Sequence, residues 1–259
     1  MAIEIFSRRE QKYLITRKQY QALIAELAPY MRDDRNGEDG RYTVSSLYFD
    51  NAERAIYYET KNKLKYRQKL RLRIYGDTGP DGLAFFEVKQ KHGKVVYKRR
   101  LTMPLSEAHR YLNAPIFESV DDYESSNPQV LKEIDYFRRL YRLEPTMIVA
   151  YDRHAMHGKS NSDLRITFDF NLRCRRDELQ LEKGPHGSHF IDPDLVVMEV
   201  KVDQSVPLWL ARILQQQNCE QRSASKFCTS TEQLADTVLA PAGFTEQTTI
   251  GGDSHGKDQ

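Results

Sequence analysis

The sequence predicts an α+β protein built on a closed, eight-stranded antiparallel β-barrel with flanking helices. Segments rich in β-branched and aromatic residues recur along the chain, and short glycine-containing turns join three of them in succession. Apolar residues at helical spacing occur between and after these segments. Strands joined by tight turns pair as antiparallel neighbours, so the arrangement is expected to be a meander that continues into a barrel.

The strands are predicted from alternation and from β-branched or aromatic content. They lie at residues 8–14, 42–50, 64–75, 83–91, 94–103, 146–154, 162–174 and 195–202. The clearest are the three strands of the meander, because a loop over 76–82 and a tight His92-Gly93 turn connect them.

The helices are predicted where apolar residues return every three or four positions. They run from Thr16 to near Pro29, briefly within 52–62, and over 106–112, 129–141, 209–217 and 225–239. Thr16 and Gln19 have the spacing of a capping box, and Ser106 is the expected cap of its helix.

The domain organisation is predicted to be simple. No linker divides the chain, so residues 1–240 form one domain, and residues 241–259, rich in Gly, Thr, Asp and Ser, form a disordered tail. Cys174, Cys219 and Cys228 make no CxxC pair, which fits a reducing cytosol. Neither a signal peptide nor a transmembrane segment is expected, so the predicted location is cytoplasmic. Association with a membrane partner stays an open alternative, and the oligomeric state is not assigned.

The total charge excludes one class of partner. Lys plus Arg number 39 against 37 for Asp plus Glu, a net charge of +2. A protein that coats nucleic acid carries a larger excess, so no nucleic-acid partner is expected. The placement of the cations therefore matters more than their number.

Charged side chains occupy every second position of several predicted strands, and successive side chains of a strand point to opposite faces. The sets that share a face are Arg71 with Arg73, Glu87 with Lys89 and Lys91, Lys98 with Arg100, Tyr151 with Arg153, Arg165 with Thr167 and Asp169, and Glu199 with Lys201. A solvated exterior explains any one strand, but it predicts mixed charges rather than a run of cations. A curved sheet with these faces inside would form a pocket for a polyanion.

Such a cationic face needs compensation. A like-charged pair a few ångströms apart costs about 4 kcal/mol at an effective dielectric of about 20. Acids or a bound polyanion must offset this cost, and arginine grips phosphate oxygens bidentately. A polyphosphate or the tail of a nucleoside triphosphate fits. Glu199, an acid among the cations, has two interpretations of equal weight, as a ligand of a divalent metal or as a salt-bridge partner.

An ordered series of short motifs runs through the chain. It comprises Lys12-Tyr13, Ser46-Leu47-Tyr48-Phe49-Asp50, Arg71-Leu72-Arg73, Glu87-Val88-Lys89, Lys98-Arg99-Arg100, Tyr151-Asp152-Arg153, Arg165-Ile166-Thr167-Phe168-Asp169, Glu199-Val200-Lys201 and Ser225-Lys226. Over roughly residues 5–235 this series resembles the polyphosphate-polymerase domain of the vacuolar transporter chaperone (VTC) family, within the triphosphate tunnel metalloenzyme superfamily.

The resemblance implies a basic tunnel in which the γ-phosphate of ATP is transferred to a growing polyphosphate chain with a divalent metal, Mn²⁺ or Mg²⁺. The catalytic residues that it implies are Arg71, Arg73, Lys89, Arg153, Arg165 and Glu199, with Glu199 as metal ligand. The further phosphate-binding residues are Lys12, Lys98, Tyr151, Ser225 and Lys226.

Two departures qualify the resemblance. The superfamily opens with Glu-x-Glu-x-Lys, whereas this chain has Arg8-x-Glu10-x-Lys12, and the missing acid favours a polymerase over a two-metal hydrolase. The sensor domain and membrane helices of the eukaryotic polymerases are not found, so the expected form is the stand-alone bacterial one. The alternatives are a triphosphatase or nucleotide-processing tunnel enzyme, and a non-catalytic module that binds polyphosphate.

Overall fold

The computed structural model describes residues 9–93, 95–115, 118–222 and 225–239, with the backbone alone for 235–239. Its strands are β1 (Arg9–Thr16), β2 (Met31–Asp33), β3 (Arg41–Asp50), β4 (Tyr66–Tyr75), β5 (Leu83–His92), β6 (Val95–Pro104), β7 (Glu144–Gly158), β8 (Arg165–Arg175), β9 (Ser188–His189) and β10 (Leu195–Val202). Its helices are α1 (Arg17–Leu27), α2 (Ala55–Lys61), α3 (Leu105–Asn113), α4 (Pro128–Tyr141), the 3₁₀ turn η1 (Leu181–Lys183), α5 (Leu208–Gln216) and α6 (Lys226–Leu239).

One antiparallel sheet organises the molecule. Its strand order is β1-β10-β8-β7-β3-β4-β5-β6, with β2 paired to β7 and β9 paired to β8. The expected meander is present as β4, β5 and β6. Gly93 adopts a φ of 58° in the turn after β5, a left-handed conformation that glycine takes without steric cost.

The expected closed barrel is wrong, because the sheet stays open between β1 and β6. The outer edge of β1 is occupied instead by the segment before α6: Arg222 donates its backbone N–H to the carbonyl of Lys12 at 2.8 Å, and Gln221 forms a bridge with Tyr13. The opposite edge, β6, carries Lys98, Arg99 and Arg100, and charged residues of this kind discourage edge pairing. Alternation predicts the face of a side chain, but closure also depends on strand tilt and stagger.

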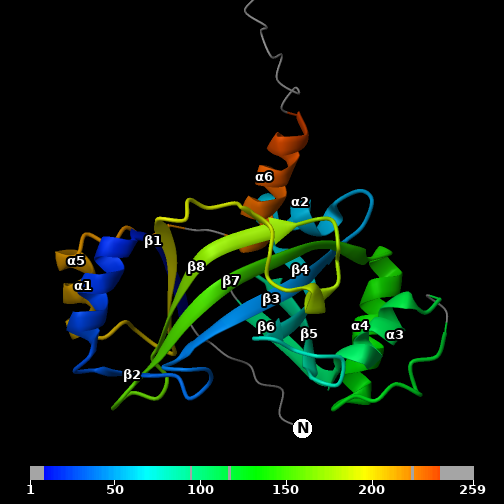
Figure 1. Ribbon diagram of the computed structural model, residues 1–259, viewed down its shortest axis with the longest axis horizontal. Coiled ribbons are helices and arrows are strands. Elements are labelled where there is room, and N and C mark those ends of the chain that lie inside the picture. The colour runs from blue at the N-terminus through cyan, green and yellow to red at the C-terminus, as the bar shows by residue number, and fades with distance from the viewer. Residues whose placement is uncertain (1–8, 94, 116–117, 223–224, 240–259) are drawn as a thin grey trace, which may run out of the picture.

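Two helical layers cover the convex face of the sheet (Figure 1). On one side α1 and α5 pack on β1, β8 and β10 around Leu23, Phe168 and Met198. On the other side α3 and α4 pack on β5 and β6 around Phe86 and Leu131. Burying each large apolar side chain contributes about 1.5–3 kcal/mol. These layers hold the sheet in its curve, and α2 and α6 lie together at one end of it.

Most predicted elements lie within a few residues of their observed bounds. The capping box at the start of α1 is confirmed, since Thr16 accepts from the Gln19 backbone N–H. The Ser106 cap is wrong: α3 begins one residue earlier, at Leu105, after Pro104 and without a side-chain cap. The short strands β2 and β9 were not predicted. Arg8 and the predicted tail, 241–259, lie outside the described residues.

Among the described residues, no helix has the length and apolar character needed to cross a bilayer.

Candidate polyanion site

The concave face of the sheet is lined with charged side chains. Leu70 and Leu72 of β4 are fully buried on the convex side, so Arg71 and Arg73 between and beyond them project to the concave side. The cations on this face are Lys12, Lys69, Arg71, Arg73, Lys89, Lys98, Arg100, Arg153, Arg165, Lys201 and Lys226, and the carboxylates are Glu10, Glu87, Asp169 and Glu199. Cations outnumber carboxylates, and the balance of this face favours a bound anion.

Glu87 of β5 is the centre of a first group of cations, the Glu87 group. Its carboxylate, 1% exposed, lies 2.5 Å from the nearest side-chain nitrogens of Arg71 on β4 and of Lys98 and Arg100 on β6. Burial favours the neutral acid, but Arg71 and the cations around it outweigh burial, and they hold the pKa of Glu87 far below its usual value. The acid therefore stays ionised and holds the three cations together.

Glu199 of β10 and Asp169 of β8 are the centres of a second group, the Glu199 group. Glu199 lies 3.0 Å from the ammonium of Lys226, 3.3 Å from that of Lys12 and 3.4 Å from that of Lys201. Asp169, fully buried, lies 2.6 Å from Lys226. Burial opposes ionisation of Glu199, but Lys226 and the other lysines reverse it and lower its pKa well below the usual value. Glu199 thus forms ion pairs with three lysines, and its role as a metal ligand stays a prediction.

Tyr151 links the two groups. Its hydroxyl accepts from Arg73 at 3.2 Å and from Arg153 at 3.4 Å, and Arg153 binds Asp169 through Nε at 2.7 Å. Arg73 also donates to the Ser46 hydroxyl at 3.0 Å. The residues from β3, β4, β7 and β8 thus form one continuous polar layer.

The start of α6 closes one end of the concave face. Ser225 directly precedes α6, and its hydroxyl accepts from the Cys228 backbone N–H at 3.3 Å, as a helix cap does. The Lys69 ammonium donates to the same hydroxyl at 3.1 Å. The Phe227 ring stacks on Tyr48 at 5.2 Å. Ser225 and Lys226 therefore face the concave side of the sheet, at the end where α6 begins.

Lys89 and Arg165 occupy different surroundings from the other predicted residues. Burial lowers the pKa of Lys89, and the charge of Glu10 on β1 partly opposes this. Arg165 lies at the end away from α6, where it donates to Asp34 at 3.0 Å and to the Tyr42 hydroxyl at 3.1 Å. Arg165 therefore belongs neither to the Glu87 group nor to the Glu199 group.

Several side chains on this face have pKa values shifted to about 8. Desolvation lowers the pKa of Lys69 and of Lys98 to about 8 in each case, although Lys98 is 40% exposed. Burial would raise the pKa of Tyr48, but Arg71 and Arg73 outweigh it and lower the value to about 8. An anion bound here would return both lysines to their charged form, because it offsets the cost of their burial.

Sequence reasoning left several members of the face out of the site. Lys69 precedes Arg71 by two positions and Arg100 follows Lys98 by two, so the alternation that found their neighbours also includes them. Asp169 was recognised as facing the same way as Arg165, but nothing in the sequence pairs it with Lys226 of a distant helix. That contact depends on where α6 packs.

The acids offer limited coordination to a metal ion. Within the described part of the chain, no three His, Cys, Asp or Glu side chains are grouped to hold one. Glu10 and Glu199 share the ammonium of Lys12, at 3.2 and 3.3 Å, so two hard oxygen donors converge there. This donor set fits Mg²⁺ or Mn²⁺ in the mode in which one or two carboxylates bind the ion and substrate phosphates complete its shell.

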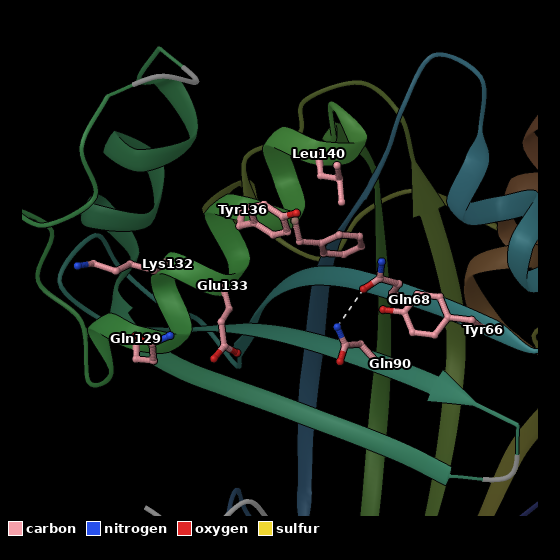
Figure 2. A pocket seen from close by; sticks show the side chains of 9 residues that line it. Tyr66, Gln68, Gln90, Gln129, Lys132, Glu133, Tyr136 and Leu140 are labelled. Carbon is pink, nitrogen blue, oxygen red and sulfur yellow. Dashed lines mark hydrogen bonds between the residues drawn. The ribbon is translucent and has the colours of Figure 1, made fainter.

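A cavity of about 440 Å³ lies on the other side of the same strands (Figure 2). It is formed by α4 and by the Tyr66–Gln68 end of β4, and the Gln90 side chain donates to that of Gln68 at 3.0 Å. The one cation among its lining residues, Lys132, pairs with Asp121 at 2.8 Å. Amides and aromatic rings do not suit a polyphosphate, so the concave face is the better candidate.

The fold and the site together define an α+β protein whose curved antiparallel sheet presents a cationic concave face. The family model described as "VTC domain" matches residues 7–235, nearly the whole of the described chain. The chain belongs to the VTC domain family, and the resemblance predicted from the motif series is confirmed.

Three proteins are similar to this chain. Vacuolar transporter chaperone complex subunit 4 of Trypanosoma cruzi (strain CL Brener) is 24% identical over 210 residues, which are 67% of this chain and 26% of that protein. The chain thus spans about a quarter of that relative's length. A candidate adenylate cyclase from Vibrio parahaemolyticus aligns with a TM-score of 0.46 and 13% identity over 88% of this chain and 98% of its own. The PH1819 protein of Pyrococcus horikoshii OT3 gives 0.46 and 14% over 87% and 99%. Both likenesses are distant, so family membership depends on the sequence match.

Proposed function

We propose that this chain is a phosphotransferase that moves the γ-phosphate of ATP onto the end of a polyphosphate chain held on the concave face. The observation that supports it most is the excess of cations around few, fully engaged carboxylates on one curved surface. Its relative in Trypanosoma cruzi carries the name of a vacuolar transporter chaperone subunit, which is consistent with this proposal.

The proposed reaction is an in-line displacement. A terminal phosphate oxygen of the acceptor chain attacks the γ-phosphorus, a new P–O bond forms, the bond from the γ-phosphorus to the β,γ-bridging oxygen breaks, and ADP leaves. The attacking oxygen is already ionised, so no general base is needed. Positioning and charge stabilisation are the tasks left to the protein.

The roles of the side chains follow from their contacts. Arg73 and Arg153 are held by the Tyr151 hydroxyl at fixed separation, which suits donors that must meet the equatorial oxygens of the transferred group. Arg71, Lys98 and Arg100 can exchange Glu87 for phosphate oxygens without moving a helix. Lys12 and Lys226 would neutralise the chain beside Glu199. Lys89 and Arg165 extend the cationic path toward its two ends.

A divalent ion fits as a partner of the substrate. Glu199, with Glu10 beside it, would hold the ion, and the ion would supply neutralisation of phosphate charge. The lysines on Glu199 would then be more available to the phosphates, because they would share one carboxylate with the ion.

Product analysis tests the proposal. Purified protein is incubated with ATP and Mn²⁺ or Mg²⁺, and the products are resolved on a polyacrylamide gel stained for polyphosphate. A ladder or smear that is absent in Arg73→Gln is expected. Orthophosphate or cyclic nucleotide without polymer would overturn the transferase in favour of another nucleotide-processing enzyme.

A non-catalytic module that binds polyphosphate is the second candidate. The complete engagement of Glu199 by three lysines favours it, since a metal must compete with them. Binding of tripolyphosphate with no turnover of ATP, in either metal, would establish this function instead.

A further inference from the structure

Three aromatic side chains gather at the end of the concave face away from α6. Tyr75 of β4 lies at the centre, with its ring centroid 5.8 Å from that of Tyr42 and 5.2 Å from that of Phe85, both at steep angles. All three rings are only partly buried, unlike the core aromatics Phe49 and Phe86. They are therefore accessible in a way that a packing role alone does not require.

Guanidinium groups surround these rings. The Arg100 guanidinium carbon lies 4.8 Å from the centroid of Phe85, and that of Arg73 lies 5.8 Å from the centroid of Tyr75. Arg165 donates to the hydroxyl of Tyr42 and Arg100 to that of Tyr75 at 3.3 Å. Planar rings and planar cations thus alternate at this end.

The opposite end of the same face has a different chemistry. There Lys69 and Lys89 supply ammonium groups, which act as point charges, and the nearby rings of Tyr48 and Phe227 are buried and stack on each other. Lys69 and Tyr75 are six residues apart on β4, about 20 Å at about 3.3 Å per residue. A phosphate chain has no π-face, so an aromatic end would contribute little to it, whereas a nucleobase stacks on both rings and guanidinium planes.

We infer that the Tyr42, Tyr75 and Phe85 end is the subsite for the base of a nucleoside triphosphate, so that its phosphates run from Arg73 and Arg100 toward the lysines near α6. This inference rests on the proposed function, since it orients ATP on the concave face. Arg73 and Arg100 contact the aromatic rings and also belong to the cationic part of the concave face. In this orientation the α-phosphate lies beside the rings, and the γ-phosphate lies nearer to α6.

The test compares a ligand that has a base with one that has none. Titration calorimetry measures the Kd of ATP and of tripolyphosphate for the wild type and for Tyr75→Leu and Phe85→Leu. Each variant is expected to weaken ATP about ten-fold and to leave tripolyphosphate within two-fold. Etheno-ATP fluorescence, quenched by stacking in the wild type, should rise in both variants.

Two matched variants separate stacking from packing. Tyr75→Phe keeps the ring and should retain ATP affinity and quenching. Tyr66→Leu, at the other end of β4 on the convex face, should change neither ligand.

Equal weakening of both ligands by the leucine variants would overturn the inference, because the rings would then only position the arginines. The inference would also be overturned if the wild-type protein bound tripolyphosphate without quenching etheno-ATP. That result would leave the polyphosphate site of the proposed function intact. Wild-type protein that binds neither ligand would overturn the proposed function, and the inference with it.

Discussion

The Glu87 group and the Glu199 group both place a buried carboxylate among cations, yet they differ in the cations and in their access to solvent. Glu87 is surrounded mainly by arginines, and its partners Lys98 and Arg100 are 40% and 39% exposed. Glu199 is surrounded by lysines, and its partner Lys226, the first residue of α6, is 10% exposed. Its other partners, Lys12 and Lys201, are 25% and 33% exposed, so Lys226 is the shielded cation of the second group.

The second group also has more than one acid. Asp169 shares Lys226 with Glu199, and Glu10 shares Lys12 and Lys201 with it. Loss of one carboxylate there leaves each lysine a partner. Among the described side chains that contact its three cations, Glu87 has no such substitute. The two groups should therefore respond differently to the same substitution.

The largest expected effect is on folding stability. Glu87→Gln should lower the free energy of unfolding by about 3 kcal/mol, because it leaves Arg71 and its neighbours in mutual repulsion, and the exposure of two partners keeps the loss at the low end. Glu199→Gln should cost less than half as much. Urea denaturation measures both values. Similar losses in the two variants would mean that Asp169 and Glu10 do not compensate for the loss of Glu199. Tripolyphosphate should restore most of the stability that Glu87→Gln loses, because it binds the folded protein.

The next largest effect is expected on ligand binding and ATP turnover, at Arg73 between the Glu87 group and the Glu199 group. Arg73→Gln should weaken tripolyphosphate and lower any turnover of ATP by about 100-fold, because a preorganised charged donor is lost. Arg99→Gln is the matched control, since Arg99 points to the convex side and pairs with Glu133 at 2.9 Å. Equal effects of the two substitutions would show that binding depends on general surface charge.

A smaller effect is expected from pH. With pKa values lowered to about 8, Lys69 and Lys98 lose charge above pH 8, so polyanion affinity should fall, by up to about ten-fold for each lysine at pH 9. The sign for stability is opposite: the unfolded lysines bind more protons between about pH 8 and 10.5, so their contribution to stability rises with pH.

Lys69→Arg provides the measurement, because arginine stays charged at pH 9. Calorimetry of tripolyphosphate at pH 7 and 9 and constant ionic strength should give a smaller loss of affinity in this variant. Lys132→Arg on the convex face should keep the wild-type loss. An unchanged loss in Lys69→Arg would show that Lys69 does not titrate in this range.

The smallest effect concerns the start of α6. Ser225→Ala should lower stability by about 1 kcal/mol through loss of the cap on Cys228 and should weaken tripolyphosphate a few-fold. Ser225→Asp keeps a capping oxygen but adds negative charge beside Lys69. Thermal unfolding near the wild-type value together with strongly reduced binding is expected for it. Unaltered binding in Ser225→Asp would place Ser225 outside the ligand path.

How much the sequence predicts is clearest on β4. Alternation correctly assigned Leu72 to one face and Arg71 and Arg73 to the other, because a strand has a strict period of two. The same rule applies to Lys69, whose place in the site depends on Ser225 from a segment more than 150 residues later. Local patterns carry no information on such a pairing. Glu199 shows the limit most directly, since no local pattern predicts that Lys226 of a distant helix lies beside it.

By itself, the amino-acid sequence determined the strands, the faces on which their charges lie and the membership of the VTC domain family, because each follows from local periodicity or from an ordered series of residues. Only the tertiary structure decided that the sheet stays open, which acid pairs with which cation, and that three partly exposed aromatic rings gather at one end. These depend on contacts between distant segments, above all Gln221–Arg222 on the edge of β1 and Lys226 between Asp169 and Glu199. Local sequence patterns do not show such contacts, because they form only when segments far apart in the chain pack against each other.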